Sequence, residues 1–104
     1  LVDRKKDMII VSGFNVYPRQ VDEVLFNHPQ IAEAACVGRP DPRLGEVLVA
    51  FVVVRSGAQL SEGAFFDYCR GQLVKYRRPV AVRFVDSLPR TNARKIDKKA
   101  LRRR

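Results

Sequence analysis

Three lysines near the end of the chain could act on an anionic ligand: Lys95, Lys98 and Lys99, within LPRTNARKIDKK at residues 88–99. A lysine ammonium is a compact cation on a flexible stem, so it can bridge two negative groups that repel each other. Lysine is also among the residues most often found exposed. LPRTNARK presents Lys95 without a packed face of its own, and functional residues concentrate on loops of this kind. The loop is therefore one candidate site.

A second candidate is DRKKDMIIVSGFNVYP, residues 3–18, where alternating charges lead into a predicted β-hairpin that turns at Ser12-Gly13. Gly13 has no side chain, so it can bring bare backbone close to a ligand or another surface. The alternative interpretation is structural. Gly13 then serves only the hairpin turn, and Arg4 and Lys6 belong to a solvated charge run.

Other catalytic patterns are incomplete in this sequence. His28 is the single histidine, so it is the one available base for a nucleophilic triad, and a histidine beside a helix end is more often a capping or surface group. The chain contains neither a GxGxxG motif nor a P-loop. Cys36 and Cys69 fit no CxxC spacing, so we expect buried free thiols and no metal site.

Charge is concentrated at one end of the chain. The net charge is +9, and residues 90–104 contribute +7 of it, with Asp97 as their only acid. Such an end could bind nucleic acid, an acidic membrane surface or a smaller ligand that carries phosphate. There is no apolar run of about 18 residues and no secretory signal, so we expect a cytoplasmic protein. The start at Leu1, without methionine, suggests a piece of a longer protein.

The predicted elements form one domain, because 104 residues with 46% apolar composition can build one modest core. After the hairpin at residues 8–17, Pro18 begins a helix of about ten residues. IAEAACVG is a predicted strand that ends in an exposed loop, GRPDPRLGE. EVLVAFVVV is apolar at nearly every position, which favours a central strand covered on both faces.

The second half of the chain predicts a helix, a strand and a final short helix. Ser61 is the expected N-cap of the first helix, on which Phe65, Cys69 and Leu73 form a core-facing stripe. A strand follows at residues 80–85, and Asp97 caps the last helix, which Ile96, Ala100 and Leu101 anchor. The fold class is therefore α+β, with a small mixed sheet, an N-terminal hairpin and about three helices packed on it.

Two long motifs in this order resemble a known family. DRKKDMIIVSGFNVYPRQVDEVL and LPRTNARKIDKKALR are similar to motifs of the C-terminal domain of the adenylate-forming (AMP-dependent synthetase/ligase) superfamily, acyl-CoA synthetase type. HPQIAEAACVGRPDPRLGEVLVAFVV between them also matches in order and length. The resemblance covers essentially the whole chain. It implies that residues 1–104 are a mobile lid domain. ATP, coenzyme A, Mg²⁺ and the carboxylic acid are then bound mainly by a large N-terminal domain, which is absent here.

The resemblance also implies roles for individual residues. Lys95 matches the catalytic lysine of acyl-adenylate formation, and Lys98 and Lys99 are expected on the solvated side of the following helix. Lys6 matches the hinge about which the domain swings before thioester formation. The residues implied to bind cofactors are Arg4, near the nucleotide, and Ser12, Gly13 and Phe14, along the pantetheine channel.

Three positions depart from the family pattern. Arg94 replaces the usual glycine before the catalytic lysine, and a side chain makes a positive φ more costly. We therefore expect either a different backbone path or no need for a positive φ there. Gln20 and Asp22 replace commoner glutamates, and we expect both changes to matter less because they lie on a helix.

Two alternatives remain open beside the acid-CoA ligase interpretation. The basic end could make the chain a small nucleic-acid-binding module, although Phe65, Phe66 and Tyr68 fall on the core-facing helix and not beside the basic run. A lid domain that serves a carrier protein is also possible. Under the preferred interpretation the partners are the N-terminal domain and the substrates, with no nucleic acid and at most peripheral membrane contact.

Overall fold

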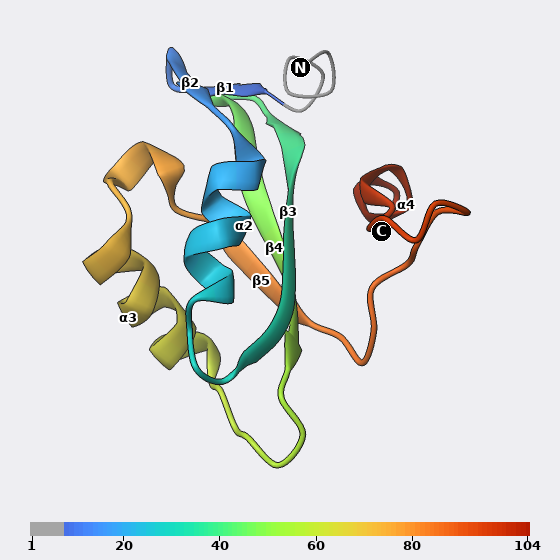
Figure 1. Cartoon of the computed structure of the whole chain (residues 1–104). Helices are drawn as coiled ribbons and strands as arrows, with labels where there is room; N and C mark the ends of the chain where they lie inside the picture. The colour runs from blue at the N-terminus through green and yellow to red at the C-terminus, as the bar shows by residue number, and fades with distance from the viewer. Residues whose placement is uncertain (1–7) are drawn as a thin grey trace.

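The computed structural model describes residues 8–104, so the predicted roles of Arg4 and Lys6 lie outside the described residues. The described chain forms one sheet of five strands with helices on both sides (Figure 1). In chain order the elements are β1 (Ile9–Val11), β2 (Phe14–Val16), α2 (Pro18–Phe26), β3 (Ile31–Asp41), β4 (Gly45–Val54), α3 (Glu62–Gln72), the 3₁₀ turn η1 (Lys75–Arg77), β5 (Ala81–Phe84) and α4 (Lys98–Arg102).

Strand β4 is the centre of the sheet, as predicted. It pairs antiparallel with β3 along nearly its whole length, parallel with β5, and antiparallel with β1 through Gly45. Strands β1 and β2 form the predicted hairpin, so the order is β2-β1-β4-β3, with β5 beside β4. The sheet is therefore mixed, and among the described strands β3 is an edge strand.

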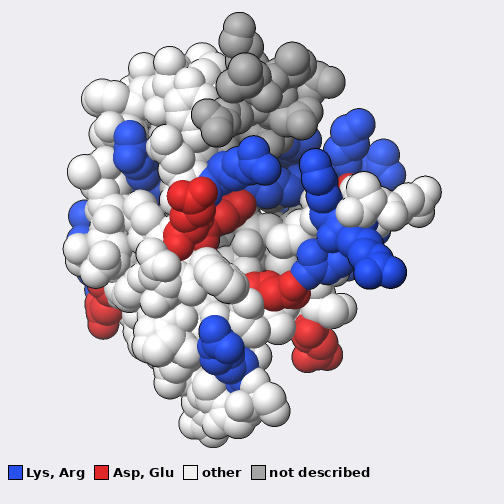
Figure 2. Space-filling model, in the orientation of Figure 1, with Lys and Arg blue, Asp and Glu red and all other residues white. Residues whose placement is uncertain are grey.

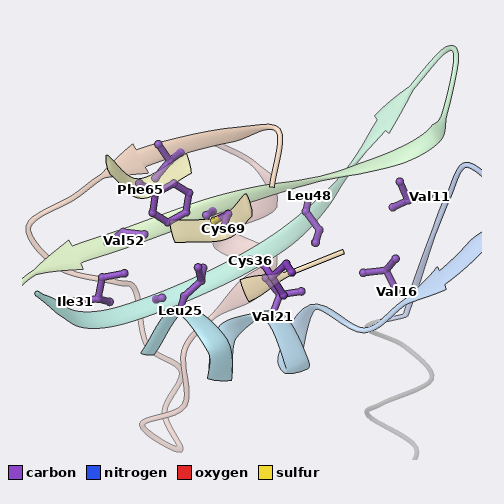
Figure 3. Packing of buried hydrophobic residues seen from close by; sticks show 14 of the residues in the cluster. Val11, Val16, Val21, Leu25, Ile31, Cys36, Leu48, Val52, Phe65 and Cys69 are labelled. Carbon is purple, nitrogen blue, oxygen red and sulfur yellow. The ribbon is translucent and has the colours of Figure 1, made fainter. Parts of the chain in front are cut away.

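Apolar side chains cover both faces of β4. On one face, β4 packs with α2 and α3 in a cluster that includes Val21, Leu25 and Phe65 (Figure 3). On the other face, Phe51 is fully buried with Leu88 and with Leu101 of α4. Figure 1 shows the same arrangement, with α2 and α3 on one side of the sheet and α4 on the other. The apolar run in β4 is thus explained by double coverage.

The helices begin where the sequence predicts. Pro18 occupies the first turn of α2, a position where its missing N–H costs nothing. The Ser61 hydroxyl accepts a hydrogen bond from the Ala64 amide at 3.1 Å, and the Asp97 carboxylate accepts one from the Ala100 amide at the same distance. These side chains satisfy amides that the first turn of a helix leaves unpaired.

One predicted loop is largely wrong. The stretch expected to form an exposed loop from Gly38 onward continues as strand β3 to Asp41, and only residues 42–44 connect it to β4. Pro40 cannot donate a backbone hydrogen bond, but an edge strand tolerates this because one of its sides pairs with no other described strand. The turn η1 was also not predicted.

Cys36 and Cys69 are buried free thiols, as predicted. Burial raises the pKa of Cys36 well above its ordinary value of 9.0. Burial also raises the pKa of Cys69 to about 11, although Arg78 opposes the shift. Both groups therefore stay neutral near pH 7 and behave as small apolar side chains in the core.

We predict that the free energy of unfolding falls as pH rises from about 9 toward 11. In this window the unfolded chain releases its thiol protons near the ordinary pKa of 9.0, while folded Cys69 holds its proton to about 11. The unfolded state then binds fewer protons, so its stability relative to the fold increases. Urea unfolding at several pH values measures the slope, and the Cys36→Ala/Cys69→Ala variant should lose this part of it. An unchanged slope in the variant contradicts the assignment.

Candidate active-site loops

Lys95 lies on a small hairpin that its own backbone holds together. Arg90 pairs with Ile96 as an antiparallel bridge, and the Thr91 amide donates to the Lys95 carbonyl at 2.8 Å. The Arg94 amide donates to the Thr91 carbonyl at 2.9 Å, which closes the turn. The Lys95 side chain is exposed. The backbone of this lysine is thus fixed by hydrogen bonds while its side chain is exposed, as the loop pattern predicts.

Arg94 adopts a left-handed conformation with φ of 64°. A three-residue hairpin loop usually ends in a residue of this conformation, most often glycine. The expectation that this position needs no positive φ is therefore wrong, because the loop keeps the positive φ although a side chain replaces hydrogen. The other expectation, a backbone path different from that of the family, stays a prediction. A non-glycine residue in this region is strained by about 1 kcal/mol.

The edge strand β3 supports this hairpin and α4 through side chains. The Arg90 guanidinium forms an ion pair with Glu33 of β3 and also donates to the Arg94 carbonyl at 3.3 Å. Arg39 of β3 donates to the Leu101 carbonyl of α4 at 3.2 Å. The segment after β5 is therefore fastened to β3 on both sides of Lys95.

Lys98 does not lie on the solvated side of α4, so that prediction is wrong. Its ammonium donates to Asp22 Oδ2 of α2 at 2.7 Å, and the Lys98 and Asp22 side chains are only 17% and 18% exposed. The pair forms because α4 lies close enough to α2 for a long side chain to reach across the edge of the sheet. Lys99 is exposed, as predicted.

Asp22 matters more than its place on a helix led us to expect. Its Oδ1 accepts a hydrogen bond from the Cys36 amide at 2.7 Å, while Oδ2 accepts from Lys98. Burial raises the pKa of the Asp22 carboxyl, and the Lys98 charge opposes this shift. A signal was present in the sequence, because Asp22 falls between Pro18 and Leu25 at helical spacing, on the stripe that is buried.

The hairpin tip brings the three predicted channel residues together. Ser12 and Gly13 have φ of 52° and 87°, as a two-residue turn between right-twisted strands requires. The Phe14 ring is 52% exposed and stacks on Tyr76 of η1, with ring centroids 4.2 Å apart and planes 14° from parallel. The unpredicted turn η1 thus braces the hairpin tip.

Within the described residues, the tip of the β1–β2 hairpin and the Lys95 hairpin do not form one site. Figure 1 shows the β1–β2 hairpin at one end of the sheet, whereas the chain around α4 lies beside β3 on the other face. Figure 2 shows Lys and Arg side chains gathered on the side of the molecule where α4 lies, with acidic side chains next to them. The domain therefore offers two separate surfaces.

The remaining candidates have structural roles. His28 Nδ1 accepts a hydrogen bond from the Gln30 amide at 3.0 Å, and its ring meets the Tyr68 ring edge-on at 4.7 Å. His28 thus caps the turn after α2, in agreement with the capping or surface role that the sequence indicates. Within residues 8–104, no group of three His, Cys, Asp or Glu side chains is placed to hold a metal ion. The same range contains no helix long and apolar enough to cross a membrane.

Similarity to known proteins identifies this fold. Residues 20–95 match the family described as the AMP-binding enzyme C-terminal domain. The chain belongs to this family. Over 102 residues it is 50% identical to a methyl-dioxo-octahydroindenyl-propanoyl:CoA ligase of Mycobacterium tuberculosis, which covers 98% of this chain and 20% of that relative. A long-chain-fatty-acid CoA ligase of Escherichia coli is 46% identical over 102 residues, covering 98% of the chain and 18% of the relative.

A solved structure of an AMP-binding enzyme shares the fold. The o-succinylbenzoate CoA synthetase of Bacillus subtilis, in complex with its acyl-adenylate intermediate, superimposes with a TM-score of 0.87. It is 37% identical, and the match covers 93% of this chain and 20% of that one. The chain spans about a fifth of the length of the relatives it matches. These relatives are acid-CoA ligases, so they favour that interpretation over the carrier-protein and nucleic-acid alternatives.

We predict that Arg94→Gly raises the free energy of unfolding by about 0.5 kcal/mol. Glycine removes the strain of the left-handed conformation, about 1 kcal/mol. It also makes the unfolded chain more flexible, which offsets part of this gain in stability. Arg94→Ala is the matched control, because it removes the same side chain and keeps the Cβ that causes the strain. Urea unfolding of the three proteins compares them. Equal stability of the Gly and Ala variants contradicts the explanation.

Proposed function

We propose that this chain, residues 1–104, is the C-terminal lid domain of an ATP-dependent acid-CoA ligase whose large N-terminal domain lies outside it. Membership in the AMP-binding enzyme family supports the reaction class, and relatives that span nearly all of this chain are named CoA ligases. The observation that carries the proposal is an exposed Lys95 on a braced hairpin, within a motif that resembles the catalytic-lysine motif of the family.

Lys95 acts in the first half-reaction of this proposal. A carboxylate that attacks the α-phosphate of ATP brings two anions together, and pyrophosphate leaves as the acyl-adenylate forms. The Lys95 ammonium lies between the two anions and stabilises the negative charge that develops at the phosphorus. A fixed backbone matters here because a donor that is already in position needs little reorganisation when the transition state forms.

The hairpin acts in the second half-reaction, where the thiol of coenzyme A attacks the adenylate and AMP leaves. Ser12, Gly13 and Phe14 line the channel for the pantetheine arm, and Gly13 allows close backbone approach. Because this surface and Lys95 lie apart, the domain turns between the two steps. Lys6 is the proposed hinge and Arg4 the proposed nucleotide contact, both outside the described residues.

ATP, coenzyme A and Mg²⁺ belong to the same proposal, held mainly by the N-terminal domain. Among residues 8–104, no group of three His, Cys, Asp or Glu side chains is placed to hold a metal ion, so we propose that Mg²⁺ binds mainly to the N-terminal domain. The acid substrate also binds elsewhere, and we propose a role in fatty acid metabolism because several relatives are named long-chain-fatty-acid CoA ligases. Two free thiols suit a reducing compartment such as the cytoplasm.

The nucleic-acid alternative loses support from the contacts of the basic end. Arg90 and Lys98 are already paired with Glu33 and Asp22, which lowers the charge available for phosphates. Phe65 is fully buried, so it offers no surface on which a base could stack. The charge that remains suits the N-terminal domain or, at most, a peripheral membrane contact.

We predict that Lys95→Ala in the full-length enzyme slows adenylate formation by about 10² to 10³, because one positioned donor is lost. Preformed acyl-adenylate should still react with coenzyme A at a rate close to that of the unaltered enzyme. Pyrophosphate release and thioester formation measure the two steps separately. Lys99→Ala, on an exposed lysine four residues away, is the control. Equal loss of both half-reactions contradicts the role of Lys95.

We predict the opposite pattern for Phe14→Ala. Loss of the stacked ring, worth about 0.5 to 1.5 kcal/mol, should slow thioester formation about two- to tenfold and leave adenylate formation unchanged. Phe26→Ala is the matched control, because Phe26 is similarly exposed on α2. Single-turnover assays of the two half-reactions make the comparison. A defect confined to adenylate formation would remove the hairpin from the channel.

A further inference from the structure

A contact between three elements holds the segment that carries Lys95. We name it the edge latch, formed by the Asp22 carboxylate of α2, the Lys98 ammonium of α4 and the backbone amide of Cys36 in β3. Helices α2 and α4 cover opposite faces of the sheet (Figure 1). The latch therefore crosses the edge of β3 and ties one layer to the other.

Each atom of the latch has a fixed place. Cys36 is fully buried in the core, and its amide points away from β4, so it needs an acceptor outside the sheet. Asp22 supplies that acceptor at 2.7 Å and is held there by its neighbours in α2, since Val21 and Leu25 are fully buried. The second carboxylate oxygen then stands ready for Lys98 at 2.7 Å.

Because Lys98 is held in place, it restrains the backbone of Lys95, which lies three residues earlier in the chain. The intervening Asp97 caps α4 through its side chain, and its amide donates to the Pro89 carbonyl at 2.8 Å across the base of the hairpin. Helix α4 has only five residues, too few to be stable without tertiary contacts. Leu101 anchors one end of α4 in the core, and the latch anchors the end nearest Lys95.

We infer that Asp22 and Lys98 are positioning residues for adenylate formation, which set the place of Lys95 without touching the substrate. The inference rests on the proposed role of Lys95. A displacement of about 1 Å in a reacting group can cost about 10²-fold in rate, so a small shift of the hairpin base has a measurable effect. The printed hydrogen bonds of Asp22 and Lys98 join α2, β3 and α4 and do not reach the β1–β2 hairpin, so we expect thioester formation to keep its rate.

The test uses the full-length enzyme with Lys98→Met, which keeps the length of the stem and removes the charge. Adenylate formation should fall at least tenfold, while preformed adenylate reacts with coenzyme A within twofold of the normal rate. Hydrogen exchange should become faster in residues 88–97 and stay unchanged in β4. Lys98→Arg, which can still reach Asp22, should recover most of the activity. Lys99→Met and Glu23→Gln, at exposed neighbours, are the matched controls.

A single variant leaves one charge buried without its partner and could fail to fold. The double variant Asp22→Asn/Lys98→Met removes both charges and keeps an oxygen for the Cys36 amide, so it retains the fold. It should show the same selective loss of adenylate formation. Normal adenylate formation in this folded variant overturns the inference, and so does an equal fall in both half-reactions, which indicates a purely structural pair.

The same assays separate this inference from the proposed function. If Lys95→Ala retains adenylate formation, the role of Lys95 is wrong and the positioning role is wrong with it. If Lys95→Ala loses that step and the double variant keeps it, Lys95 is catalytic and the latch is not needed to place it. Only selective loss in both variants supports the two assignments together.

Discussion

The structure depends on one constraint, the burial of β4 on both faces. Ten residues with almost no polar side chain cannot form an outer layer, so helices must cover each side of the strand. Helices α2 and α3 cover one face. Among the described residues, the chain after β5 passes across the other face and buries Leu88 and Leu101 against Phe51. The packing of Leu88 and Leu101 in the core therefore fixes the position of the segment between them, which carries Lys95.

This arrangement explains how a small domain can present two surfaces without internal rearrangement. The hairpin tip is braced by Tyr76, and the Lys95 loop is braced by the side chains of β3 and α2. Tyr76 and helix α2 pack against the core on one face of the sheet, and β3 is part of the sheet itself. The domain rotation that we propose can then exchange one surface for the other, because neither loop has to change its internal structure.

Local features of this fold could be read from the sequence, whereas features made by distant contacts could not. Ser61 and Asp97 act on amides three residues away, so their type and place were sufficient to predict the caps. Lys98 resembles any helical surface lysine until its partner 76 residues earlier is known. Arg94 shows a third case, because a side chain makes the left-handed conformation costly but the surrounding hydrogen bonds of the hairpin still impose it.

Strand β3 has a further consequence. Among the described strands it is an edge strand, eleven residues long, and a long open edge can recruit a strand from another molecule and start aggregation. In the middle of that edge, the Asp22 carboxylate accepts the hydrogen bond of the Cys36 amide and also pairs with the Lys98 ammonium. Arg39 and Glu33 place further charges along the same strand. An approaching chain would have to displace these groups before it could pair, so the edge protects the domain against self-association.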